Sequence, residues 1–151
     1  MNQAERRVWL INALLDERPD GRDVAVPAGA DEQRDLLRAL MNVRPPEALT
    51  TETLDVQDAY LHQRIVERGG ATDAGTLPYR NHVAVWRGDI TLLKADAIAN
   101  AANSQMLGCF VPGHHCIDNA IHTYAGMQLR LTCANLMCKQ GHEEPTARVK
   151  V

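Results

Sequence analysis

The sequence has few aromatic residues, no charge excess and no long apolar run, and each absence excludes a class of protein. Aromatic residues make up 4% of the 151 positions, too few for the base-stacking surface of a single-strand-binding protein. The formal net charge of -3 provides no field of one sign to hold nucleic acid or an acidic membrane. No apolar run approaches the roughly 20 residues that cross a bilayer, and residues 1–21 lack a secretory signal pattern. We therefore expect a cytoplasmic protein that binds neither membranes nor nucleic acid directly.

Cysteine is absent from the first 108 residues, which argues against a disulfide framework spread along the chain. The cysteines are Cys109, Cys116, Cys133 and Cys138. In a cytoplasmic protein such residues are more often thiols or metal ligands than disulfides. Any cysteine chemistry is therefore expected to be local to the last third of the chain.

The first part of the chain has the spacing of short amphipathic helices. Apolar residues recur at helical intervals within residues 3–15, 36–41 and 54–66, and proline or glycine follows each run. We interpret residues 1–70 as an N-terminal helical extension, a small bundle that serves as scaffold or lid. Residues 71–80 are interpreted as a connector.

The remainder of the chain has the pattern of an α/β domain. Residues 82–86 and 96–100 are expected to be short strands, a helix is expected from near Cys116 to the low 130s, and residues 147–151 alternate like a third strand. This order favours an α/β sheet. The chain stops within the last expected strand, although a parallel sheet needs several strands and helices on both faces. We therefore expect residues 81–151 to be the N-terminal part of an incomplete domain.

Two motifs follow the first two expected strands, where open α/β sheets bind ligands. The GDIT motif (88–91) follows the first strand, and the Asp89 carboxylate can accept a hydrogen bond from an amino group such as that of a purine. The NAAN motif (100–103) follows the second strand and can offer its amides to sugar hydroxyls. Each motif alone is equally compatible with a simple turn stabilised by its own side chain.

A third motif, residues 108–116, places two cysteines and two histidines on a loop with Pro and Gly before the expected helix. Thiolate and imidazole are the usual zinc ligands, and a turn can bring Cys109 towards His114 and Cys116. Three protein ligands leave the open fourth position of a catalytic zinc site. The alternatives are buried thiols, a redox pair, or a structural site closed by one of the two later cysteines.

Together the three motifs resemble the macrodomain family of ADP-ribose-binding modules. Residues 85–108, VWRGDITLLKADAIANAANSQMLG, are similar to the opening of that family, with GDIT, a strand and then NAAN. Residues 108–122 replace the glycine-rich loop of most hydrolytic members and resemble the microbial zinc-dependent branch. The resemblance implies a macrodomain-like three-layer α/β/α sandwich, of which this chain holds the first half only, after a small N-terminal helical bundle.

The resemblance also implies roles for individual residues. Asp89 resembles the aspartate that bonds the adenine amino group, and Ile90 backs the ring. Asn103 resembles an asparagine at the distal ribose, and Asp118 occupies the place of a catalytic aspartate. We therefore take Asn103 and Asp118 as candidate catalytic residues. The further candidate ligand-binding residues are Gly108 and His122.

The implied metal is Zn²⁺, held by Cys109, His114 and Cys116. It would act as a Lewis acid on the distal ribose or activate a water, and Asp118 would orient that water or serve as general base. Asp118 and His122 are four residues apart, so geometry alone places them on one helix face. The implied reaction is removal of mono-ADP-ribose from a modified protein.

The implied partners are ADP-ribose and an ADP-ribosylated protein substrate, with a lipoyl-carrier protein as the target and a sirtuin-type transferase as the modifying enzyme. The alternatives are a non-catalytic ADP-ribose-binding module and a zinc-stabilised interaction domain. Family members continue beyond this length with further strands and a second glycine-rich loop that holds the diphosphate. We therefore expect the 151-residue chain to fold poorly and to be a poor enzyme.

Overall fold

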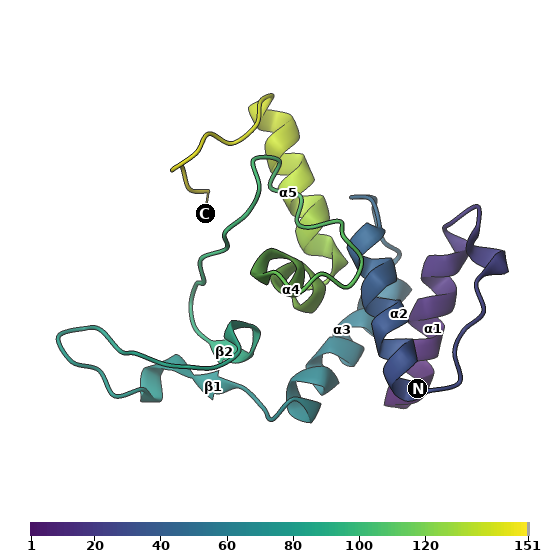
Figure 1. The fold of residues 1–151 in the computed structure, drawn as a ribbon, viewed down its shortest axis with the longest axis horizontal. Helices are drawn as coiled ribbons and strands as arrows, with labels where there is room; N and C mark the ends of the chain where they lie inside the picture. The colour runs from purple at the N-terminus through teal and green to yellow at the C-terminus, as the bar shows by residue number, and fades with distance from the viewer. Residues whose placement is uncertain (151) are drawn as a thin grey trace.

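The computed structural model describes residues 1–150, which form five α-helices and two very short strands (Figure 1). No helix within these residues has both the length and the apolar character needed to span a bilayer. The helices are α1 (Gln3–Asp16), α2 (Ala30–Val43), α3 (Thr51–Glu67), α4 (Ile117–Tyr124) and α5 (Met127–Gln140), and the strands are β1 (Thr72–Asp73) and β2 (Leu93–Lys94).

The helices expected in the first 70 residues are confirmed, and local sequence signals explain their ends. Asn2 caps α1, because its side chain accepts the Glu5 N–H at 3.0 Å and the Glu5 carboxylate accepts the Asn2 N–H at 2.8 Å. Thr50 caps α3 by accepting the Thr53 N–H at 3.1 Å. The second helix ends at Val43, shortly before two prolines that cannot continue it.

The apolar core lies between the first three helices and extends to α5. Leu10, Ile11 and Leu37 are almost completely buried within it. Met127, at the start of α5, is 5% exposed in the same cluster, and Tyr124 of α4 packs against it. The other buried members are Leu14, Leu15, Leu40, Met41, Val56, Tyr60 and Leu61. The core therefore joins the N-terminal helices to the segment that carries the cysteines.

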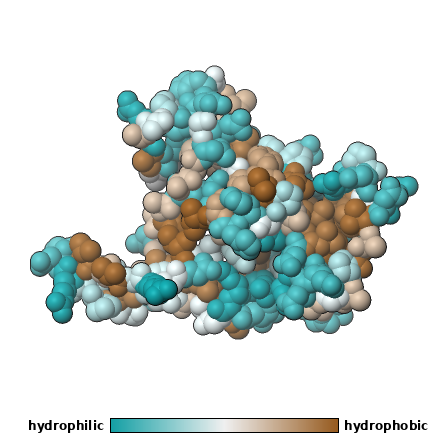
Figure 2. Space-filling view, viewed as in Figure 1, coloured by the Kyte–Doolittle hydropathy of each residue, from teal (hydrophilic) through white to brown (hydrophobic). Residues whose placement is uncertain are grey.

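The prediction of strands at residues 82–86 and 96–100 is wrong, since neither segment is a strand in the described part of the chain. A strand needs neighbours for its backbone N–H and C=O groups, and residues 1–150 place no ladder beside either segment. Val85 is consequently 92% exposed, and Figure 2 shows apolar residues on the arm that projects between β1 and β2. Residues 1–150 thus contain only a two-stranded parallel sheet, not a three-layer sandwich. Its register pairs Thr72 with Leu93 and Asp73 with Lys94.

The single helix expected from Cys116 to the low 130s is instead two helices, because the chain turns sharply at Gly126. This glycine has a φ of 89°, which side-chain-bearing residues rarely adopt. Gln57 of α3 accepts the Met127 N–H at 2.8 Å and so holds the start of α5. The break therefore comes from a glycine that the tertiary structure uses to turn the chain.

The third expected strand is also wrong over residues 147–150, and Val151 lies outside the described residues. Ala147 has a φ of 64°, a left-handed conformation that interrupts a strand. The Lys150 ammonium instead pairs with the Glu144 carboxylate at 3.2 Å. The segment therefore turns back on itself rather than extending beside β1 or β2.

Candidate functional site

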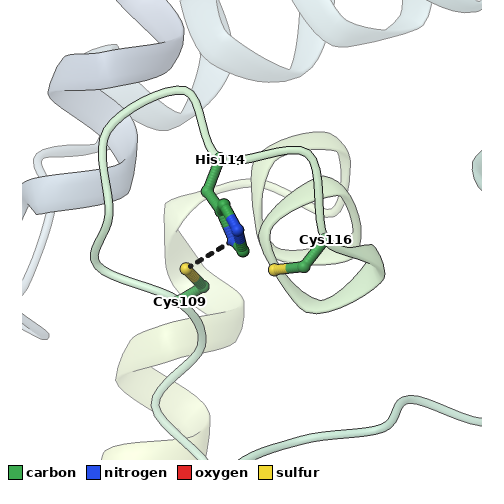
Figure 3. A group of neighbouring side chains, drawn as sticks. All are labelled: Cys109, His114 and Cys116. Carbon is green, nitrogen blue, oxygen red and sulfur yellow. Dashed lines mark hydrogen bonds between the residues drawn. The ribbon is translucent and has the colours of Figure 1, made fainter.

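Cys109, His114 and Cys116 lie together in the loop before α4, as the sequence predicts (Figure 3). Their ligand atoms all lie within 4.8 Å of one another, and Cys109 Sγ is 3.5 Å from His114 Nδ1. Two thiolates and one imidazole are a donor set that zinc prefers, so the chemistry of the group fits this metal. The described residues contribute three candidate ligands to the group, and three is the number of protein ligands in open, catalytic sites.

The loop brings the three ligands together through a tight turn and a helix cap. Gly113 has a φ of 64°, and the His114 N–H donates to the Val111 carbonyl at 3.2 Å. Cys116 is the N-cap of α4, where its Sγ accepts the Asn119 N–H at 3.4 Å. The turn therefore folds Cys109 back towards the start of α4, where Cys116 is already held.

Asp118 and His122 face each other on α4, and the two side chains are buried. Asp118 Oδ1 accepts a 2.8 Å hydrogen bond from Asn100 Nδ2 and lies 3.6 Å from His122 Nε2. Burial lowers the pKa of His122 below its ordinary value of 6.5; Asp118 opposes this shift and the charge of Arg130 adds to it. His122 is therefore neutral at pH 7 and contacts an aspartate whose position Asn100 holds.

Gly108 lies against the His122 ring and leaves no room for a larger residue. Its φ is 80°, and a Cβ built there would lie 2.6 Å from His122 Cγ. The adjacent Leu107 carbonyl accepts a 2.7 Å hydrogen bond from the buried Arg130. Gly108 thus allows the ligand loop to approach α4 closely.

Asn103 uses its side chain to shape the loop that leads to the cysteines. Its Nδ2 donates to the Gly108 carbonyl at 3.1 Å, and its Oδ1 accepts the Gln105 N–H at 3.1 Å. The residue is exposed, and its backbone carbonyl accepts the Met106 N–H at 3.0 Å. Asn103 therefore lies at the surface of the loop, and its role in binding ribose stays a prediction.

Asp89 begins a short 3-10 turn, Ile90–Leu92, next to α4. Its Oδ1 accepts the Thr91 N–H at 2.9 Å and the Thr91 hydroxyl at 2.7 Å, and its Oδ2 pairs with Arg68. Partial burial alone would raise the pKa of Asp89, but the Thr91 hydrogen bonds and the Arg68 charge together lower it. Asp89 is therefore a carboxylate at pH 7 with its side chain held in place.

A surface depression with a volume of about 300 Å³ lies beside this turn. Ile90 and Ile98 line one part of it, and Ile121 and Tyr124 of α4 line another. Its lining combines apolar side chains, which suit a flat ring, with Thr91 and Asp96, and the opposite end of α4 carries Asp118 and the candidate metal-ligand group. Helix α4 therefore connects the depression to the cysteine loop.

Several polar side chains that contact these groups were not among the predicted site residues. Asn100 had a sequence signal, because it opens the NAAN motif. The others lie on α2 or directly after α3, far along the chain from their contacts, and their sequence pattern is that of ordinary helix surface. Only the tertiary structure brings them to the site. They are Arg38, Asn42 and Arg68.

Comparison with known proteins finds one family match and several similar sequences. Residues 99–151 match the Macro domain family. A protein-ADP-ribose hydrolase of Treponema medium is 53% identical over 155 residues, which cover 100% of this chain and 59% of that protein. A protein-ADP-ribose hydrolase of Staphylococcus aureus (strain MRSA252) is 44% identical over 148 residues, which cover 97% of this chain and 55% of that protein.

A more distant relative is a probable bifunctional ADP-ribose hydrolase/ADP-ribosyltransferase of Fusarium oxysporum f. sp. cubense. It is 41% identical over 127 residues, which cover 77% of this chain and 21% of that protein. The chain spans less than two thirds of the length of each of these relatives. Residues 99–151 thus match the Macro domain, and the chain as a whole is similar in sequence to protein-ADP-ribose hydrolases.

Proposed function

We propose that this chain belongs to a zinc-dependent hydrolase that removes mono-ADP-ribose from modified proteins. The observation that carries the proposal is the group of Cys109, His114 and Cys116 directly before Asp118, in a chain 53% identical to a protein-ADP-ribose hydrolase. An open three-ligand metal group beside a buried carboxylate is an arrangement suited to hydrolysis.

The adenosine part of the ligand would occupy the depression beside the Ile90–Leu92 turn. Asp89 would accept a hydrogen bond from the adenine amino group, and Ile90 would contact the ring. The distal ribose would lie towards Asn103 and the loop at Gly108. The support for this orientation is that α4 runs from the depression to the ligand group.

At the distal ribose, Asp118 would hold the attacking water or take its proton. Asn100 donates to one carboxylate oxygen of Asp118 and leaves the other oxygen for the water. His122 is neutral and its ring packs against Gly108, so it adds no positive charge beside Asp118. Zinc, when bound by the two thiolates and the imidazole, would supply Lewis acidity at the ribose or its leaving group.

The finer features of the proposal concern the fold, the partners and the location. The complete domain would be a three-layer α/β/α sandwich, of which this chain would hold the first half. The modified substrate would be a lipoyl-carrier protein, and its modification would come from a sirtuin-type transferase. The protein would act in the cytoplasm. The division into residues 1–70, 71–80 and 81–151 also stays part of this proposal.

The test is release of ADP-ribose from purified proteins that carry a single ADP-ribose on serine, glutamate or arginine, one acceptor at a time. We expect hydrolysis that a chelator abolishes and that added zinc restores, at a low rate for the 151-residue chain. Asp118→Asn should lower the rate by about 10²–10⁴-fold, the range for loss of a general base. Cys138→Ser, which lies outside the ligand group, should leave the rate unchanged. A Cys109→Ala variant with full zinc and full rate would refute the ligand assignment.

Binding without hydrolysis would favour the alternative of a non-catalytic module. Calorimetry with ADP-ribose, in the presence of zinc, measures binding independently of turnover. Tight binding together with no release from any of the three acceptors would overturn the enzymatic proposal.

A further inference from the structure

The turn that carries His114 is hydrogen-bonded to α2, although the two lie more than 70 residues apart in the sequence. Asn42 Oδ1 accepts the Gly113 N–H at 3.0 Å. Arg38, one turn earlier on the same helix, donates from Nη2 to the His114 carbonyl at 3.1 Å. A helix of the N-terminal segment therefore contacts the backbone of a candidate metal ligand and of its neighbour.

Asn119 of α4 connects the same two parts and is completely buried. Its Oδ1 accepts hydrogen bonds from Arg38 Nη2 at 2.8 Å and Nε at 3.2 Å. Its Nδ2 donates to the Val111 carbonyl at 3.1 Å, and its backbone N–H donates to Cys116 Sγ at 3.4 Å. One residue thus joins α2 and the turn through its side chain and a second candidate ligand through its backbone N–H.

Thr123 bonds both Asn42 and Asn119 and so completes the hydrogen-bond network between α2 and α4. Its hydroxyl accepts from Asn42 Nδ2 at 3.0 Å and donates to the Asn119 carbonyl at 2.8 Å. The polar atoms of the Asn42 side chain, which is 1% exposed, are therefore satisfied in one orientation only. Removal of any member would leave buried polar groups without partners.

A metal ion binds more tightly when its ligands are already held close together, because less chain freedom is lost on binding. Groups behind the ligands usually provide this order, and their replacement typically lowers metal affinity. Here the loop itself offers one backbone hydrogen bond across the turn, from the His114 N–H to the Val111 carbonyl, and one side-chain contact, between Cys109 Sγ and His114 Nδ1. The remaining polar contacts that fix the turn come from Arg38, Asn42 and Asn119.

We propose that Arg38 and Asn42 are positioning residues of the metal site, so that α2 is part of the metal centre rather than a separate scaffold. The inference rests on the proposed metal site. It states that the conformation of the loop at residues 109–116 is held by two residues that would not touch the metal. Arg38 holds the position of His114 and Asn42 holds the turn before it.

The test measures zinc affinity and ligand geometry directly, without any activity assay. The 151-residue chain and its Arg38→Ala, Arg38→Lys and Asn42→Ala variants are titrated with zinc against a chromophoric chelator. Cobalt(II) is used in parallel, because its thiolate charge-transfer and d–d bands report on tetrahedral coordination. The matched control is Arg34→Ala, which removes an arginine one turn away on α2 that pairs with Asp31 at the surface.

We expect Arg38→Ala and Asn42→Ala to weaken zinc binding by about 10–100-fold, the usual effect of removing a group behind a ligand. Their cobalt d–d bands should lose intensity. Arg38→Lys should recover part of the affinity, since an ammonium can still donate to the His114 carbonyl but cannot also fill the fork to Asn119. Arg34→Ala should bind zinc as the parent does.

Unfolding of the metal-free variants, followed by circular dichroism, separates positioning from general destabilisation. Arg38 is only half-buried, so its variants should fold, and their zinc affinity can be measured even if Asn42→Ala does not fold. Parent-like zinc affinity and cobalt spectra in Arg38→Ala would overturn the inference. Absence of zinc binding by the parent chain would instead overturn the metal proposal, and with it this inference.

Discussion

Arg68 and Asp89 form an ion pair that links the end of α3 to the turn beside the surface depression. The Arg68 guanidinium also lies 3.7 Å from the centre of the Tyr124 ring and donates to the Thr91 hydroxyl at 2.7 Å. Arg68 thus stacks on one residue that lines the depression and pairs with the aspartate proposed to bind adenine. The helical segment at the N-terminus therefore supports this part of the site as well.

Replacement of Arg68 by Ala should raise the pKa of Asp89, because a cation and a hydrogen-bond donor are lost. The folded-state pKa is lowered below 3.8, so the Asp89 contribution to stability is present above that pH and is lost as the pH falls through the folded value. Carboxyl ¹³C chemical shifts measured against pH would give the change. Arg64→Ala, one turn earlier on α3, is the control and should leave the Asp89 titration unaltered.

His122 should make the folded state more sensitive to acid. Its folded-state pKa lies below 6.5, so the unfolded chain takes up the proton first, and the stabilising contribution of neutral His122 is lost as the pH falls from 6.5 through the folded value. His122→Gln should therefore flatten the fall in unfolding free energy between about pH 7 and pH 5. Urea titrations of the metal-free protein at a series of pH values would measure this free energy of unfolding. An identical pH profile for His122→Gln and for the exposed-site control His62→Gln would contradict this expectation.

Gly108→Ala should destabilise the protein more than an equivalent change at Gly141. Each glycine has a positive φ, but a Cβ at 108 meets the His122 ring, whereas a Cβ at 141 meets nothing within 4 Å. The difference should be about 1–3 kcal/mol, the usual cost of overpacking. Denaturant unfolding of the two variants isolates the clash from the backbone strain. Equal loss in the two variants would show that the loop can move away from α4.

The double variant Cys133→Ser, Cys138→Ser should bind zinc as the parent chain does. Within residues 1–150 the metal-ligand group contains Cys109, His114 and Cys116 and neither of the later cysteines. Burial raises the pKa of Cys133, which keeps it a thiol rather than a metal-binding thiolate. Metal content by elemental analysis, with Cys109→Ala as the comparison, measures the outcome. Loss of zinc in the double variant would indicate a closed structural site instead.

The helices were the most predictable part of the fold, because capping and helical spacing are local signals. Asn2 and Thr50 lie at helix starts, where their side chains bond N–H groups three residues on. The strands were predicted wrongly, because a short apolar run becomes a strand only when a neighbour pairs with it. Val85 illustrates this: its sequence context favours a strand, yet it is 92% exposed.

The metal-ligand group was predictable for a similar reason. Cys109, His114 and Cys116 lie within eight positions, and a turn containing Pro and Gly is enough to bring them together. That they bind zinc stays a prediction. The groups behind them were not predictable, since Asn42 is 71 residues from Gly113, whose N–H it accepts, and Asn42 belongs to no motif.

The sequence by itself determined the helices of the first 70 residues, the cluster of candidate metal donors, and the aspartate and histidine on one face of α4. Each depends on residues within about one or two helical turns, where spacing dictates proximity. Only the tertiary structure decided that Arg38, Asn42 and Arg68 reach the site. Packing of α1–α3 against α4 and α5 sets those contacts, because buried polar groups must find partners wherever the packed helices place them.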